Sequence, residues 1–97
     1  MKPPRIFTAK AIDDRTLIIE FTNQEIRKYS ILRLLENPIF YPLQEPAFFR
    51  NFQIEPGGYA IIWNEDIDLS EYTLWKNSVP ATDIDLKSVD HHDRRKI

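Results

Sequence analysis

The chain has 97 residues and a formal net charge of -2 at pH 7, a length that suits one domain and is too short for two. It contains no cysteine, which excludes disulfides, thiolate metal sites and cysteine nucleophiles. The small acidic excess argues against a protein that binds nucleic acid with its whole surface, since such proteins carry a basic excess.

The N-terminal sequence MKPPRIFTAK has no apolar run that resembles a signal peptide. No segment reaches the length of a membrane span, and a secreted domain this small would more often carry disulfides. We therefore expect a soluble cytoplasmic protein that does not enter a membrane.

Three strands are predicted in the first third of the chain, at residues 5–12, 16–21 and 25–31. The sequence TLIIEF is the clearest, because Leu17, Ile19 and Phe21 alternate with Ile18 and Glu20. In the third segment Ile26 falls on the face opposite Tyr29 and Ile31, and a β-bulge there would reconcile them. Together the segments predict an antiparallel meander.

The middle of the chain changes to a helical pattern. Ser30 is placed to cap a short helix over 31–36, and Asn37-Pro38 is expected to end it. Pro46 suits a first helical position and predicts a further turn or two of helix. Strands at FQI (52–54) and YAIIW (59–63) are expected to form a hairpin around the sequence Pro56-Gly57-Gly58.

A last short helix is predicted over 70–78 and ends before Pro80. Residues 81–97 are polar and lack periodicity, which predicts a flexible tail. The sequence therefore predicts one α+β domain over residues 1–80, an antiparallel meander followed by short helices, a β-hairpin and a C-terminal short helix, with the tail after it.

The acidic stretch IIWNEDIDLS (61–70) comes nearest to a chemical motif. Its structural interpretation is a turn and a helix cap, with Asp68 as the cap and Glu71 three residues later as in a capping box. Trp63 and Trp75 would then pack together and hold this corner, each removing roughly 200 Å² from water.

The functional interpretation of the same stretch is a small metal-dependent hydrolase that uses Glu65, Asp66 and Asp68. Hard cations prefer oxygen ligands, but the stretch lacks the spacing and glycine of a calcium loop. It also lacks two carboxylates facing each other across a cleft, as a glycosidase needs. His91-His92-Asp93 is a weaker metal candidate, because adjacent histidines seldom chelate one ion. We favour the structural interpretation, and expect no catalytic residues, no metal and no cofactor.

The order of these motifs resembles the small bacterial proteins of domain-of-unknown-function family 2442 (DUF2442). The resemblance covers roughly Arg5 to Ser78, and no single motif in it is highly specific. The positions that carry it are Phe21 and Asn23, Pro42 and Leu43, Phe49, Trp63, Asp68, and Leu74 with Trp75.

Two residues depart from the family pattern, and both lie in predicted turns. Gln24 stands where glycine often follows Asn23, and a glutamine in a left-handed turn costs something like 1 kcal/mol. That cost predicts a longer or differently shaped turn. Asp66 stands where a glycine is common before Asp68, and aspartate tolerates that geometry better.

The resemblance implies an α+β fold, a bacterial cytoplasmic home and no established reaction. Relatives that look encoded beside a second small protein suggest a toxin–antitoxin pairing with this family as the antitoxin. We therefore expect a protein-interaction module, not an enzyme, that covers a small bacterial protein with a sheet face or edge and with its tail. Asp83, Asp85 and Asp90 in the tail would pair with a basic partner.

Two further expectations stay open. An open sheet edge makes a homodimer plausible. The alternative function is a nucleic-acid-binding regulatory protein that uses Arg27, Lys28, Arg33 and residues 94–96, with affinity that falls steeply with salt.

Overall fold

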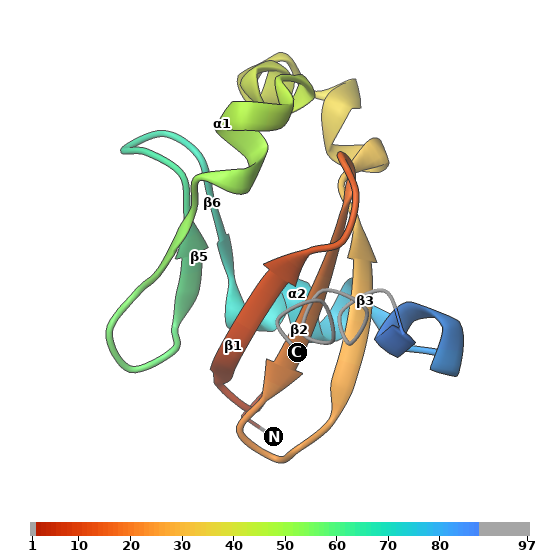
Figure 1. Cartoon of the computed structure of the whole chain (residues 1–97). Coiled ribbons are helices and arrows are strands. Elements are labelled where there is room, and N and C mark those ends of the chain that lie inside the picture. The colour runs from red at the N-terminus through yellow and green to blue at the C-terminus, as the bar shows by residue number, and fades with distance from the viewer. Residues whose placement is uncertain (1, 88–97) are drawn as a thin grey trace, which may run out of the picture.

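The fold is an α+β arrangement of two antiparallel sheets and several short helices (Figure 1). The computed structural model describes residues 2–87. In chain order the elements are β1 (Ile6–Ala11), β2 (Thr16–Phe21), β3 (Ile26–Ser30), η1 (Leu32–Glu36), η2 (Pro38–Gln44), α1 (Pro46–Arg50), β4 (Gln53–Ile54), β5 (Ala60–Ile62), β6 (Asp68–Ser70), α2 (Glu71–Asn77) and β7 (Val79–Pro80).

The larger sheet has the strand order β1-β2-β3-β7, so the predicted meander is confirmed. Strand β3 pairs with β2 without interruption from Thr16–Ser30 to Glu20–Ile26. The bulge predicted in this segment is therefore wrong, and Ile26 simply points to the face opposite Tyr29. A register shift occurs instead in β1, between Ile6 and Thr8.

The turn between β2 and β3 keeps a tight shape although it has no glycine. Gln24 adopts a left-handed conformation with φ of 74°, and its N–H donates to the carbonyl of Phe21 at 2.8 Å. The Asn23 side chain accepts a hydrogen bond from the N–H of Glu25 at 3.0 Å. The longer or differently shaped turn expected from Gln24 is not needed, because Gln24 takes the conformation that glycine favours.

The smaller sheet has the order β4-β5-β6. The predicted hairpin around Pro56-Gly57-Gly58 joins β4 to β5, and both glycines have positive φ. The N–H of Ile6 donates to the carbonyl of Gly58 at 2.8 Å, which ties this hairpin to the start of β1. Strand β6 was not predicted, since its residues were interpreted as a turn and a cap.

The connection between the two sheets is more helical than the sequence suggested. Segments η1 and η2 are both 3-10 helices, and η2 begins directly after Asn37, at the Asn37-Pro38 site that was expected to end the first helix. The Ser30 hydroxyl accepts from the N–H of Leu32 at 3.3 Å, but the cap position of η1 is Ile31. Helix α1 begins at Pro46 as predicted.

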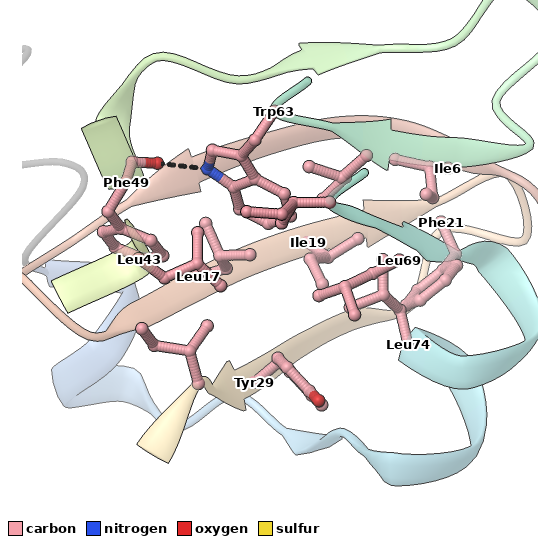
Figure 2. Packing of buried hydrophobic residues seen from close by; sticks show 13 residues of the cluster. Ile6, Leu17, Ile19, Phe21, Tyr29, Leu43, Phe49, Trp63, Leu69 and Leu74 are labelled. Carbon is pink, nitrogen blue, oxygen red and sulfur yellow. Dashed lines mark hydrogen bonds between the residues drawn. The ribbon is translucent and has the colours of Figure 1, made fainter. Parts of the chain in front are cut away.

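The core lies between the inner face of the larger sheet and the smaller sheet, with α2 and the helical connection closing it (Figures 1 and 2). Leu17, Ile19 and Phe21 supply the inner face of β2 and are almost completely buried. Leu74 of α2 and Phe49 of α1 are fully buried against them. The alternation read in TLIIEF is therefore the pattern that fills the core.

The chain leaves the core through β7, a two-residue strand that the sequence did not predict. Val79 pairs with Lys28 of β3, and the N–H of Ala81 donates to the carbonyl of Ile26 at 3.0 Å. Residues 83–87 then form a helical turn, drawn in blue beside β3 in Figure 1. The tail predicted over 81–97 is described only in this first part, and its last ten residues, Asp90 and His91 to Asp93 among them, lie outside the described residues.

Candidate interaction surface

The acidic stretch forms the tight connection between β5 and β6. The side-chain oxygen of Asn64 accepts hydrogen bonds from the N–H groups of Asp66 and Ile67, both at 2.8 Å. Glu65, Asp66 and Asp68 are all exposed to solvent. Within residues 2–87, no three histidine or acidic side chains gather where they could hold a metal ion. The geometry is that of an Asx-type turn.

The predicted cap at Asp68 is wrong. Asp68 lies in β6 opposite Ile62, and the cap of α2 is Ser70, whose hydroxyl accepts from the N–H of Thr73 at 3.1 Å. Glu71 does lie in the first turn, where the helix dipole favours a negative charge. Pairing with β5 places Asp68 inside strand β6, so the helix begins after Ser70 instead.

The two tryptophans do not form the expected pair, because each has other partners. Trp63 packs on Phe49 with ring centres 6.3 Å apart, and its indole N–H donates to the Phe49 carbonyl at 2.8 Å (Figure 2). Trp75 meets Phe21 edge-on at 5.1 Å. Trp63 therefore joins α1 to the smaller sheet, whereas Trp75 joins α2 to the larger one.

The cations proposed for nucleic acid do not form one patch. Arg27 lies over the Trp75 ring and pairs with Glu25 at 3.1 Å, while Lys28 on the opposite face of β3 pairs with Asp85. Arg33 lines a cleft beside Tyr29 that Lys28 also lines, whereas Arg27 does not line it. Burial raises the pKa of Tyr29, and the positive charge of Arg33 partly opposes that rise. Residues 94–96 lie outside the described part of the chain.

The helical turn after β7 carries its own capping box. The Thr82 hydroxyl accepts from the N–H of Asp85 at 3.2 Å, and the Asp85 carboxylate accepts from the N–H of Thr82 at 2.8 Å. This reciprocal pair matches the [ST]-x-x-[DE] spacing of a capping box. The residues around this motif lack periodicity, so a helical turn was not predicted here.

Asp85 also joins this turn to the larger sheet. Its Oδ2 atom lies 3.2 Å from the ammonium nitrogen of Lys28, and its side chain is only 12% exposed. The backbone hydrogen bond from Thr82 lowers the pKa of Asp85, and Lys28 lowers it further, against an opposing effect of burial. Asp85 is thus already paired within the domain, whereas Asp83 is exposed.

A shallow hollow lies on the outer face of the larger sheet, beside this turn. Its volume is about 200 Å³, and Ile18, Ile26 and Leu86 supply its apolar lining. Lys10 and Glu20 add one charge of each sign. The outer face therefore combines an apolar hollow with charges of both signs, and Leu86 of the docked turn lines that hollow.

Asp66, which stands where the family pattern often has a glycine, does not need the conformational freedom of glycine. Gln24 is the one non-glycine residue with positive φ among the described residues, so Asp66 does not take a left-handed conformation.

No helix within residues 2–87 combines the length and the apolar character needed to cross a bilayer.

Comparison with known proteins identifies the family directly. The family model described as "Protein of unknown function (DUF2442)" matches residues 6–80, from the first strand to the end of β7. The comparison with curated proteins gave no match, and neither did the comparison with solved structures.

Proposed function

The chain belongs to the DUF2442 family, and from that premise we propose that it is a protein-interaction module that binds one small partner protein. The proposed binding surface is the outer face of the larger sheet together with Thr82 and the helical turn at 83–87. The observation that carries the proposal is the apolar hollow formed by Ile18, Ile26 and Leu86 on that face.

The chemistry of the hollow favours a protein as the partner. An apolar floor with Lys10 and Glu20 beside it suits a partner that inserts an apolar side chain between charges of both signs. A polyanion would meet the carboxylate of Glu20 and gain little from the apolar floor. Exposed Asp83 adds a site for a basic side chain of the partner.

The mechanism would be occlusion, in which the module covers the active surface of its partner. An antitoxin-like role is the finer form of this proposal, and it rests on the family resemblance. The helical turn at 83–87 supports binding by occlusion. Its Asp85 pairs with Lys28, so part of the binding surface is held in place before the partner arrives.

The test compares two leucine variants. Leu86→Glu places a charge in the hollow, whereas Leu32→Glu makes the same change at an exposed leucine of η1 that does not line it. Each tagged full-length chain would be expressed at native level in its own organism and purified with nuclease. We expect one stoichiometric small protein to accompany the unmodified chain and the Leu32→Glu variant, and to be lost from Leu86→Glu.

Two outcomes would overturn the proposal. Equal recovery of the partner with both variants would remove the hollow from the interface. Recovery of every chain without a stoichiometric protein would argue against an interaction module.

A further inference from the structure

A groove runs along the side of the molecule where the N-terminal segment passes α2. Two adjoining hollows of about 610 and 430 Å³ share the residues Lys2, Pro3 and Tyr72 as lining. The first extends towards Arg5 and Tyr59, and the second towards Trp75 and Lys76. None of these residues lines the hollow on the outer face of the larger sheet.

Cations and aromatic rings alternate along this groove. The Arg5 guanidinium carbon lies 5.4 Å from the centre of the Tyr59 ring, and its Nη1 donates to the Tyr59 hydroxyl at 3.0 Å. The ammonium of Lys76 lies 5.5 Å from the centre of the Tyr72 ring. Tyr72 is 53% and Tyr59 47% exposed, so both keep surface that a ligand can reach, although Gly57 packs closely against the Tyr59 ring.

The groove is positively charged although the chain as a whole is acidic. Its lining contains the cations Lys2, Arg5 and Lys76, the cation Arg27, which is already paired with Glu25, and one carboxylate, Glu71. The chain carries a net charge of -2. The cations are therefore concentrated here, and such a concentration attracts a polyanion.

We propose that this groove binds single-stranded nucleic acid. Phosphates of the strand would contact Lys2, Arg5 and Lys76, and unpaired bases would stack on Tyr59 and Tyr72. An acidic peptide would satisfy the cations but would leave the two open rings without a planar partner. A duplex keeps its bases stacked inside and offers none to the tyrosines. This surface differs from the one the sequence suggested and shares only Arg27 with it.

The test measures binding of a fluorescein-labelled 12-mer of deoxythymidine to the full-length chain by fluorescence anisotropy, at several salt concentrations. Tyr41 of η2 serves as the control for Tyr72, because it is similarly exposed, at 51%, and lies outside this groove. We expect Tyr72→Ala to weaken binding roughly tenfold. Tyr72→Phe should restore binding, and Tyr41→Ala should leave it unchanged. Affinity should fall steeply as salt rises.

Several results would overturn this inference. One is the absence of binding at low salt, and a second is equal loss with Tyr72→Ala and Tyr41→Ala. A third is tighter binding of a duplex of the same length. Binding of a poly-glutamate peptide at the same site, with affinity insensitive to Tyr72→Ala, would assign the groove to an acidic protein partner instead. The Leu86→Glu variant should bind the 12-mer normally, so this test stands apart from that of the proposed function.

Discussion

The ammonium nitrogen of Lys28 lies 3.2 Å from Oδ2 of Asp85, and this ion pair joins the helical turn after β7 to the outer face of the larger sheet. The two residues are 57 positions apart in the sequence. Because the Lys28 side chain is one-third and that of Asp85 one-eighth exposed, the pair is partly shielded from solvent screening. It brings Leu86 to the hollow of the proposed interaction surface.

The capping box predicts that backbone N–H groups of this turn are protected from hydrogen exchange. Replacing Thr82 by alanine removes the hydroxyl that accepts from the Asp85 N–H, a loss of about 1 kcal/mol of local stability. The N–H of Leu86 donates to the Thr82 carbonyl at 3.0 Å, so its hydrogen exchange should speed up about fivefold. An unchanged exchange rate at Leu86 would mean that the capping box does not hold the turn.

The ion pair also predicts a pH dependence for the same turn. The folded-state pKa of Asp85 is lowered, so its contribution is fully present above the unfolded value of about 3.9. That contribution is lost as pH falls through the lowered folded pKa. Leu86 exchange, corrected for the intrinsic rate, should therefore lose protection at acidic pH. An Asp85→Asn variant carries no titrating group there and should lack this transition.

Substitution of Trp63 should destabilise the fold more than the burial of its side chain alone suggests, because its indole N–H makes a buried hydrogen bond. Trp63→Phe removes the donor to the Phe49 carbonyl and leaves that carbonyl unpaired in the core. The free energy of unfolding should fall by about 2 to 3 kcal/mol, from the orphaned acceptor and the lost packing. Urea denaturation would measure this, and a loss below about 0.5 kcal/mol would contradict the assigned role.

Gln24 and Gly58 both have positive φ, and they predict opposite responses to substitution. Gln24→Gly should raise the free energy of unfolding by about 1 kcal/mol, because glycine adopts this conformation without a Cβ penalty. The melting temperature should rise by about 4 to 8 °C for a domain of this size. No rise, or a fall, would show that the unfolded-state entropy of glycine outweighs the relief.

Gly58→Ala should instead destabilise the fold. A Cβ atom there would collide with the backbone carbonyl of Ile6, whose own N–H donates to the Gly58 carbonyl. The expected loss is about 3 kcal/mol, from the strained conformation and the clash together. A melting temperature equal to that of the unmodified chain would contradict the close approach of the hairpin to β1.

Elements that depend on a local sequence pattern were predicted correctly, whereas elements that depend on pairing with a distant strand were not. The pattern TLIIEF gave β2 with its correct bounds, because alternation is a local property that one buried face imposes. Pro46 and the Pro56-Gly57-Gly58 turn were found for the same local reason. Strands β6 and β7 were missed, because two or three residues carry no periodicity and become strands only through pairing with β5 and β3.

The candidate surface was less accessible to prediction for the same reason. The Trp63–Trp75 pair was inferred from nearness in the chain, but each ring packs on an element that the sequence alone does not place. Asp85 was expected to be free for a partner, and only the fold brings Lys28 to it. The Thr82-x-x-Asp85 spacing was a local signal that could have been found.

The most direct test of the central claim is the affinity of the recovered partner for the two leucine variants, measured by isothermal titration calorimetry with the full-length chain. If the outer face and its docked turn bind the partner, Leu86→Glu should weaken affinity at least about tenfold, or roughly 1.4 kcal/mol. Leu32→Glu should match the unmodified chain. Equal affinities for the two variants would contradict the account.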